Sequence, residues 1–410
     1  MKRYLFLCLL ITGYSHLEAQ HRAKKVIFII ADGIPADMIE KAKPPVINAI
    51  AKTGGYKRAH VGGERGGYSQ TPTISAVGYN SLLTGVWANK HNVWGNDIKD
   101  PDYNYPSLFR LLKEAYPDKK TAIFSTWQDN RTRLVGDSLP QTGNFAIDYH
   151  ADGFELDTLG YPHDPKSGYI HAIDEKVTGL AADCIRNQAP DLTWLYLEYT
   201  DDMGHRYGDG PQMNEAIGYM DRQVGKIWNE IQYRQQHFAE DWLIVITTDH
   251  GRDSVTGRNH GGQSDRERTT WIVTNAHGLN SYWKDSEPAI VDILPTITRF
   301  MDIPLPRENL MELDGVALIG KVSVTEPAVR LAEGKFDIHW KPVDKDGHLK
   351  IWVSTTNHYK EGGKDSYKLL GEVPVSQRSA IFGAGSDSSA FYKIVLEAPD
   401  NTVNRWIPVK

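Results

Sequence analysis

Cysteine is nearly absent from this sequence. Its 410 residues include two cysteines, Cys8 and Cys184. Cys8 lies in an N-terminal stretch with the features of a secretion signal, so Cys184 would be alone in the mature chain and no intramolecular disulfide is expected. A chain of this length can bury a core large enough to fold without such crosslinks.

Long apolar segments are also lacking. The apolar run Leu5–Ile11 follows Lys2 and Arg3 and precedes a small-residue cleavage pattern, Leu17-Glu18-Ala19, which is typical of a signal peptide over residues 1–19. The run is too short to span a bilayer, and a buried N-terminal strand is the alternative interpretation. We therefore expect a bacterial periplasmic or secreted protein whose mature form is soluble and not membrane-spanning.

The sequence also lacks clusters of basic residues. The formal net charge is -6, and no run of Lys or Arg is long enough to indicate a nucleic-acid groove. Duplex nucleic acid is therefore not an expected partner, although nucleotides and other small phosphoesters are not excluded. Hydrophobic residues make up 40% of the chain and charged residues 24%, a balance that favours a globular fold.

The chain alternates short β-branched runs with helical patterns. The apolar runs predict buried strands at 25–31, 121–125, 192–199, 242–248 and 270–274. Helical patterns are found at 107–116, 174–188 and 289–301, and in a long segment that begins near Pro211. There, Met213, Ile217, Met220 and Val224 recur at spacings of three and four, which is typical of a helix face packed on a core. The alternation predicts an α/β domain with a mainly parallel sheet flanked by helices.

Two regions break this alternation. Residues 135–168 are rich in Gly, Pro, Asp and His, and are interpreted either as a cap beside the active site or as a plain surface excursion. From about residue 327 the pattern changes to strands at 336–340, 349–354 and 391–396, separated by turn residues. The expected organisation is therefore a catalytic domain over 24–322 and a small all-β, sandwich-like domain over 327–410.

Acidic and histidine residues gather where three predicted strands end. They are Asp32, Asp201, His205, Asp249 and His250, with His260 a short distance further along. The carboxyl ends of strands form the ligand-binding edge of an open parallel sheet, so we expect these side chains to meet. Each alone has an ordinary explanation, such as a turn cap or a surface helix pair. Together they predict a metal centre, and mixed carboxylate and imidazole ligands favour zinc over calcium.

A nucleophile candidate lies close to this constellation in the predicted fold. Two adjacent divalent ions can clamp an in-line displacement at phosphorus, and such a site needs an attacking group. Ser75 follows the turn-prone Thr71-Pro72-Thr73 and begins a predicted helix, where free backbone N–H groups favour an alkoxide and a bound phosphate. The alternatives are that Ser75 is only an N-cap and that Thr71 or Thr73 is the nucleophile.

These motifs together resemble those of the alkaline phosphatase superfamily. They are Asp32-Gly33, Ser75 with Leu82-Leu83-Thr84-Gly85, Asp201-x-x-Gly-His205 and Asp249-His250-Gly251. Their order is the family's order, the resemblance covers roughly residues 24–320, and the nearest branch is the nucleotide pyrophosphatase/phosphodiesterase type. It implies the superfamily's central sheet and two divalent metal ions, expected to be zinc.

The resemblance also implies a role for each matching residue. One metal would be held by Asp201, His205 and His260, with His277 a rival for the last position. The second metal would be held by Asp32, Asp249 and His250, with Ser75 reaching toward it as the attacking group. In His91-Asn-Val-Trp-Gly-Asn96, the asparagine matches a family residue that holds a phosphoryl oxygen, so Asn96 is the candidate donor.

Three departures from the family pattern bear on the substrate. Phosphodiesterases of this type usually use threonine where this chain has Ser75, and His260 lies closer to the Asp-His pair than usual, as in the phosphomutase branch. Phosphomonoesterases with this asparagine add a Lys-x-Arg pair, whereas Ser125–Arg131 offers Arg131 without the lysine. The missing lysine favours diester over monoester substrates, so we expect a phosphodiesterase that forms a phosphoseryl intermediate.

Other functions remain as alternatives. A phosphomonoesterase with the same machinery comes first, followed by a phosphomutase or phosphotransferase. A sulfatase is disfavoured because Ser75 is not followed by x-Pro-x-Arg. A non-catalytic surface protein that contacts glycans through the C-terminal domain is the remaining hypothesis, and the complete set of ligand residues speaks against it.

Overall fold

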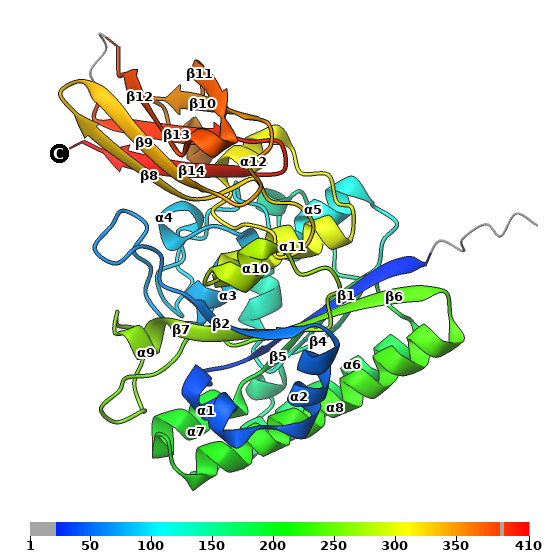
Figure 1. The fold of residues 1–410 in the computed structure, drawn as a ribbon. Coiled ribbons are helices and arrows are strands. Elements are labelled where there is room, and N and C mark those ends of the chain that lie inside the picture. The colour runs from blue at the N-terminus through cyan, green and yellow to red at the C-terminus, as the bar shows by residue number, and fades with distance from the viewer. Residues whose placement is uncertain (1–21, 386–388, 410) are drawn as a thin grey trace, which may run out of the picture.

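The centre of the molecule is a seven-stranded sheet. In the computed structural model, which describes residues 22–385 and 389–409, the strand order is β2-β7-β6-β1-β5-β3-β4 (Figure 1). The strands are β1 (Ala23–Ala31), β2 (Gly55–His60), β3 (Thr121–Ser125), β4 (Tyr149–Ala151), β5 (Leu192–Leu197), β6 (Glu240–Thr247) and β7 (Thr269–Thr274). All pairs among β6, β1, β5, β3 and β4 are parallel, whereas β7 pairs antiparallel with β6 and with β2. The predicted, mainly parallel sheet is confirmed.

The apolar runs become central strands because both faces of the sheet are covered. Residues 26–31 of β1 are completely buried, and β1 lies between β5 and β6 in register, with Val26 opposite both Leu192 and Leu243. Strands buried on both faces read as continuous apolar runs rather than as alternating patterns. The predicted strands agree with the observed ones to within two residues at each end.

Helices form a layer on each side of the sheet (Figure 1). One layer contains α1 (Ala36–Ala42), α2 (Pro45–Thr53), α6 (Gly168–Asn187), α7 (Tyr199–Tyr207) and α8 (Pro211–His237). The other contains α3 (Ser75–Thr84), α4 (Ala88–His91), α5 (Leu108–Ala115), α10 (Ser281–Asp285) and α11 (Ile293–Phe300). The apolar face predicted for the long helix, α8, packs on the core, since Met213, Ile217, Met220 and Val224 are at most 1% exposed.

Shorter helical turns complete the chain. They are α9 (Asp265–Arg268), α12 (Arg307–Glu312), η1 (Asn130–Val135), η2 (Pro140–Thr142), η3 (Phe154–Leu156), η4 (Ile290–Asp292), η5 (His358–Glu361) and η6 (Val375–Gln377). Two predicted helices have different bounds: the segment expected over 174–188 begins earlier, as α6, and that expected over 289–301 divides into η4 and α11. The irregular segment 135–168 supplies the edge strand β4, which pairs with β3. Propensity alone did not identify β4 because its three residues are only part-buried or exposed.

The C-terminal part is a separate all-β unit. A four-stranded antiparallel sheet, β11-β10-β13-β14, faces a three-stranded sheet, β12-β9-β8. The strands are β8 (Val324–Ala332), β9 (Lys335–Pro342), β10 (His348–Ser354), β11 (Lys368–Pro374), β12 (Ser379–Gly383), β13 (Phe391–Glu397) and β14 (Thr402–Pro408). Phe336 of one sheet packs edge-on against Tyr392 of the other. The predicted fold class, a parallel-sheet domain with a small β domain, is therefore confirmed.

A buried ion pair, reinforced by a second carboxylate of the β unit, joins that unit to the sheet domain. Lys393 of β13 is 1% exposed in its side chain, and its Nζ lies 2.5 Å from Oε1 of Glu312 in α12 and 2.7 Å from Oδ2 of Asp365. Both carboxylate side chains are 2% exposed. Because these charges are removed from water together, each depends on the others for compensation.

Strand β14 contacts a loop of the sheet domain. The Trp406 ring stacks on Tyr68, with 5.9 Å between ring centroids, and Arg405 forms an ion pair with Glu64. Both partners lie in the loop after β2, which leads through residues 69–74 to helix α3. The last strand described thus stabilises the segment that precedes the start of α3.

The predicted signal peptide, residues 1–19, lies outside the described residues, as does Cys8. Within the described ranges, no helix is both long enough and apolar enough to cross a bilayer. Cys184 is a free, part-buried thiol.

Candidate active site

Three adjacent central strands, β6, β1 and β5, carry the predicted ligands at their carboxyl ends. Asp32 follows β1, Asp249 and His250 follow β6, and Asp201 lies in the helix α7 that begins just after β5. Gly33 is needed at the turn after β1, because its φ is 63° and an added Cβ would lie 2.3 Å from Oδ1 of Asp201. The order of strands in the sheet therefore brings residues that are far apart in sequence to one edge.

Asp32, Asp249 and His250 form one group of ligand atoms that lie within 4.8 Å of one another. Nε2 of His250 is 3.5 Å from Oδ1 of Asp32 and 3.2 Å from Oδ2 of Asp249. These two carboxylate oxygens are buried and have no hydrogen-bond partner among the described residues. Nδ1 of His250 lies 2.9 Å from the Gly251 carbonyl, to which it donates, so the lone pair of Nε2 faces the carboxylates.

Without a cation, this group is electrostatically strained. Burial, with the nearby Asp201 charge, raises the pKa of Asp32 to about 7. Burial and the Asp32 charge raise the pKa of Asp249 well above its usual range, and burial lowers that of His250. Two unpartnered carboxylate oxygens and one imidazole lone pair, converging in a buried space, have the donor chemistry of a zinc site. The residues therefore fit a divalent ion.

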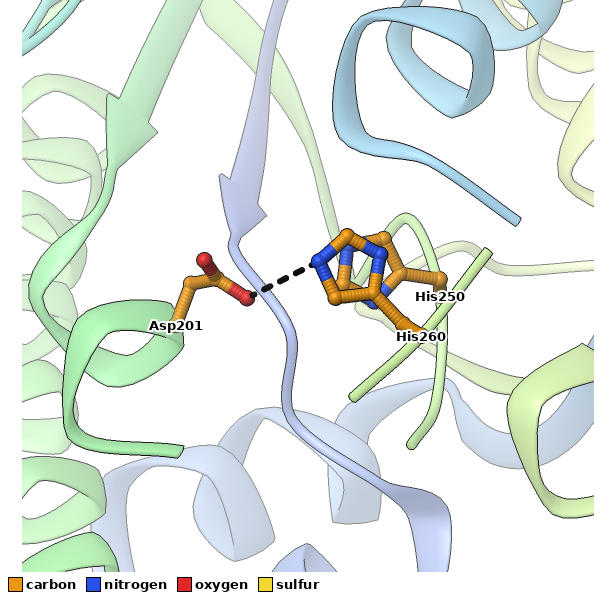
Figure 2. Close-up of side chains that lie close together, drawn as sticks. All are labelled: Asp201, His250 and His260. Atoms are coloured by element: carbon orange, nitrogen blue, oxygen red, sulfur yellow. Dashed lines mark ion pairs between the residues drawn. The ribbon is translucent and has the colours of Figure 1, made fainter. Parts of the chain in front are cut away.

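Asp201, His205 and His260 meet beside this group. Nε2 of His205 is 3.2 Å from Oδ2 of Asp201 and 3.1 Å from Nε2 of His260. Figure 2 shows Nε2 of His260 directed at Oδ1 of Asp201, 4.0 Å away, with His250 stacked behind the His260 ring. Nδ1 of His260 donates to the Thr73 carbonyl at 2.9 Å, which leaves Nε2 free as a ligand atom.

The second group of potential ligands differs in one member from the expected set. Its atoms within 4.8 Å of one another come from Asp201, His250 and His260. His205 contacts Asp201 and His260 but has a 44% exposed side chain, at the rim of the site. The rival His277 is exposed in the turn after β7 and belongs to neither of the groups formed by the described residues.

Arg252 is a site residue that the sequence reading missed. Its buried guanidinium contacts Oδ1 of Asp201 and donates from Nε to the Gly33 carbonyl at 2.9 Å. Gly204 makes room for it, since a Cβ there would lie 2.2 Å from the guanidinium. Burial opposes ionisation of Asp201, but Arg252 and His205 together hold the pKa of Asp201 below its usual range. The only sequence signal was the position of Arg252 directly after Asp249-His250-Gly251.

Ser75 lies at the first turn of α3 with its side chain directed at the ligand cluster. Its Oγ is 3.3 Å from Nε2 of His250. Ile74 is the N-cap of α3, so Ser75 is not a capping residue. Gly78 lets the helix approach, because a Cβ there would lie 2.9 Å from the Asp249 carbonyl. The helix N-terminus therefore presents Ser75 where backbone N–H groups favour negative charge.

The two rival hydroxyls are used elsewhere. Oγ1 of Thr73 donates to the Gly262 carbonyl and accepts from the Gly261 amide, each at 2.9 Å. Oγ1 of Thr71 donates to the Ser69 carbonyl at 2.9 Å. Neither threonine lines the cavity that contains Ser75.

Asn96 and Arg131, the other two predicted catalytic residues, have different positions. Oδ1 of Asn96 accepts from the Ala76 amide at 3.0 Å, so its Nδ2 remains available beside Ser75. The structure does not bring Arg131 to the site: its guanidinium lies 2.5 Å from Asp137 and 2.6 Å from Asp152, and it does not line the cavity. These two carboxylates already neutralise it, a pairing that sequence spacing does not reveal.

Two tyrosines hold Asp32 in place. Tyr196 donates to Oδ2 of Asp32 at 2.7 Å, and the Tyr79 hydroxyl contacts both that oxygen and the Tyr196 hydroxyl. Because Oδ2 is engaged in this way, Oδ1 is left as the free ligand atom. Tyr79 lies one helical turn after Ser75, and this spacing was the available sequence signal.

A cavity of about 330 Å³ opens beside Ser75. Its wall combines site residues with side chains from the segment after β3, the irregular segment and the start of α6. They are Asp32, Ser75, Tyr79, Asn96, Thr126, Trp127, Glu155, His163, Tyr169, Ile170, Ile173, Tyr196, Glu198 and Asp201. Glu155 and His163 come from the segment 135–168, so part of that segment does border the site.

Comparison with known proteins gives a consistent family assignment. Residues 26–298 match the family described as type I phosphodiesterase / nucleotide pyrophosphatase. The chain is 24% identical over 254 residues to venom phosphodiesterase CdcPDE of Crotalus durissus collilineatus, covering 60% of this chain and 28% of that protein. It is 29% identical over 318 residues to GPI ethanolamine phosphate transferase 2 of Schizosaccharomyces pombe, covering 70% of this chain and 37% of that protein.

The chain thus spans less than two fifths of the length of these two relatives. Among solved structures, a 2-O GAG sulfatase superposes with a TM-score of 0.50 at 12% identity, covering 78% of this chain and 81% of that one. At this identity the similarity concerns the fold alone.

Proposed function

Because the chain belongs to the type I phosphodiesterase/nucleotide pyrophosphatase family of the alkaline phosphatase superfamily, we propose that it hydrolyses phosphodiesters through a phosphoseryl intermediate at Ser75. One observation carries the proposal. The Ser75 hydroxyl lies 3.3 Å from Nε2 of His250, beside two buried carboxylate oxygens, from Asp32 and Asp249, to which no described residue donates a hydrogen bond. A hydroxyl at such a place is suited to act as a nucleophile rather than as a structural group.

The residues divide into two candidate metal sites. Asp32, Asp249 and His250 would hold one ion, and Asp201 and His260, with His205 at the rim, would hold the other. When bound, divalent ions such as zinc would lower the pKa of coordinated hydroxyl groups and stabilise negative charge on oxygen. The mixed nitrogen and oxygen donor set is the reason for proposing zinc.

Ser75 would carry out the first half of the reaction. Its Oγ forms a bond to phosphorus as the bond from phosphorus to the leaving ester oxygen breaks, and the leaving oxygen ends as an alcohol with the proton lost from Ser75. Nδ2 of Asn96 can donate to a phosphoryl oxygen, because Oδ1 is already held by the Ala76 amide. The N-terminal end of α3 adds a favourable field for the same charge.

Water completes the cycle. It attacks the phosphoserine, the phosphorus–Oγ bond breaks, and Ser75 regains its proton as a phosphate monoester is released. The products of one turnover are therefore one alcohol and one phosphate monoester.

The charge of the cavity favours diesters over monoesters. A monoester carries one more negative charge than a diester near neutral pH and needs an additional cation. Arg131 is the cation expected there, and its guanidinium is bound by Asp137 and Asp152. Among the residues that the structure describes, no Lys or Arg lines the cavity, whereas Glu155 and Glu198 do.

We propose that the protein is exported, as the N-terminal sequence indicates.

The test compares two substrates and one variant. The zinc-loaded protein is assayed on bis-4-nitrophenyl phosphate and 4-nitrophenyl phosphate, with bound metal measured by mass spectrometry. We expect the diester to have the larger kcat/KM and Ser75→Ala to lower it by at least a thousandfold while metal binding persists.

Each other result points to a different function. A preference for the monoester would assign a phosphomonoesterase. Full activity of Ser75→Ala would remove Ser75 as the nucleophile. Absence of both metal binding and turnover would favour a non-catalytic role.

A further inference from the structure

The two candidate metal sites differ in how many free carboxylate oxygens they offer. We name them the Asp32 site, which consists of Asp32, Asp249 and His250, and the Asp201 site, which consists of Asp201 and His260 with His205 at the rim. In the Asp32 site, Oδ1 of Asp32 and Oδ2 of Asp249 are buried and accept no hydrogen bond from any described residue. This site therefore offers a cation two carboxylates, each with a free oxygen.

The Asp201 site has one carboxylate, and both of its oxygens already have a partner. Oδ1 of Asp201 contacts the guanidinium of Arg252, and Oδ2 lies 3.2 Å from Nε2 of His205. Arg252 is permanently charged and its side chain is completely buried, so water and salt screen the pair only weakly. The carboxylate charge of this site is therefore neutralised by the protein itself.

The fold holds Arg252 in this position. Its Nε donates to the Gly33 carbonyl at 2.9 Å and its Nη2 donates to the Asp201 carbonyl at 2.7 Å. Its Nη1 donates to the Arg258 carbonyl at 3.2 Å. Glycines leave the space for it, because a Cβ at Gly33 or at Gly204 would lie 2.6 Å or 2.2 Å from the guanidinium. The charged group cannot move away from Asp201 without losing these hydrogen bonds, so it competes with an ion for the carboxylate.

We propose that Arg252 makes the two sites unequal: the Asp32 site binds a divalent ion tightly, and the Asp201 site binds its ion weakly. The inference rests on the two-ion site of the proposed function. A divalent ion in the Asp32 site meets two negative charges, whereas in the Asp201 site it meets one negative charge and one fixed positive charge. The ion of the Asp201 site is therefore the exchangeable one, and hydrolysis depends on the zinc concentration that fills this site.

A purely orienting role for Arg252 would change metal affinity in the opposite direction. Removing a partner that only orients a ligand side chain weakens metal binding by about 10- to 100-fold. Removing a fixed positive charge that competes with the ion strengthens binding instead. The direction of the change in an Arg252 variant therefore distinguishes the two roles.

Calorimetric titration measures both affinities without turnover. The metal-free, full-length protein is titrated with zinc in the presence of a competing chelator, and mass spectrometry counts the ions bound per chain. We expect two binding steps whose dissociation constants differ by about a hundredfold or more. Asp249→Asn should weaken the tighter step and His260→Ala the weaker one, which assigns each step to its site.

Variants of Arg252 test the cause of the difference. Arg252→Met removes the charge and should strengthen the weaker step about tenfold or more, with a smaller effect on the tighter step. Arg252→Lys keeps the charge and should not strengthen the weaker step. If circular dichroism shows that Arg252→Met does not fold, Arg252→Gln removes the same charge with a side chain that can still donate a hydrogen bond, and the same strengthening is expected.

Arg206→Met is the matched control. Arg206 lies in α7, as Asp201 does, but it pairs with Asp202, which belongs to neither group of potential ligands formed by the described residues. The control should leave both dissociation constants within about threefold of the wild-type values, because its charge is partly exposed and screened. Equal affinity of the two wild-type steps would refute the inference. A weaker step that is unchanged or weakened further in the neutral Arg252 variant would also refute it.

Failure of the inference can be told apart from failure of the proposed function. If the protein binds two ions with the expected inequality but cleaves neither nitrophenyl ester, the hydrolase proposal is wrong and the inference stands. If Ser75-dependent hydrolysis is found and the two ions bind equally, the function stands and the inference is wrong. If no zinc binds, the proposed metal centre and the inference are both wrong.

Discussion

The buried cluster of Lys393, Glu312 and Asp365, which joins the β unit to the sheet domain, allows a quantitative prediction. Lys393 reaches from β13 to Glu312 in α12 and to Asp365. We expect Lys393→Met, which keeps the length and the apolar stem of the side chain, to destabilise the protein strongly. The substitution removes the positive charge and leaves two carboxylates, each 2% exposed, facing each other in a space that water does not enter.

The magnitude follows from this burial. Removing one partner of a buried ion pair costs about 3 to 5 kcal/mol, because the remaining charge is uncompensated. Here two carboxylates lose the same partner, so the cost should lie in the upper part of this range. Tyr105 and Tyr367 each have a hydroxyl within 3.4 Å of the Glu312 carboxylate. Their hydrogen bonds reduce the energetic cost of removing Lys393 but do not replace its positive charge.

Urea unfolding followed by tryptophan fluorescence measures the effect, with Lys364→Met as the matched control. Lys364 pairs with Glu308, so this pair also links the β unit to α12, but the side chains are 81% and 44% exposed. An exposed pair contributes about 0 to 1 kcal/mol. If Lys393→Met changed the free energy of unfolding by less than 1 kcal/mol, or no more than the control, the electrostatic reasoning would be refuted.

Three further predictions concern the catalytic part of the molecule. Arg252→Met should lower the free energy of unfolding of the metal-free protein by about 3 kcal/mol, because Asp201 loses its buried counter-ion; urea unfolding in EDTA checks this, and an unchanged midpoint would contradict it. Burial raises the pKa of Asp292 to about 7, so the folded state retains a proton that the unfolded chain releases above about pH 4. Stability should therefore fall between pH 4 and pH 7, by about 1.4 kcal/mol for each unit of pKa difference, and the fall should be smaller in Asp292→Asn when unfolding is measured at both pH values; equal slopes would count against it. Gly78→Ala should lower kcat/KM about tenfold or more, because the new Cβ would lie 2.9 Å from the Asp249 carbonyl and displace α3. Circular dichroism should show that the variant keeps the native fold. Wild-type kinetics would contradict the prediction, because they would mean that α3 accommodates the extra methyl group.

The sequence predicted what depends on local pattern and chain order. Buried parallel strands are continuous apolar runs, so β1, β3 and β7 were located closely. Once the strands are placed, their carboxyl ends share an edge of the sheet, and this is why Asp32 and Asp249 could be expected together. The structure brings them within reach of His250, as expected.

What the sequence did not predict depends on pairing across the fold. Arg131 looked like an available cation, but it is held by Asp137 and Asp152, both of which belong to the irregular segment 135–168. Arg252 was overlooked because its role depends on the space left by glycines elsewhere in the chain. Such contacts have no periodicity and no fixed spacing, so only the folded arrangement shows them.

The contact between β14 and the loop after β2 has a consequence for how the chain matures. Tyr68 and Glu64 are made early in synthesis, whereas Trp406 and Arg405 follow more than three hundred residues later. The loop that leads to Ser75 cannot form its contacts with Trp406 and Arg405 until β14 is present, even though all predicted metal ligands precede the β unit. A nascent or proteolysed chain that stops before β14 would therefore contain every predicted catalytic side chain. It would still lack the contacts that hold the loop preceding Ser75. The β unit therefore secures the approach to Ser75 only after β14 has been made.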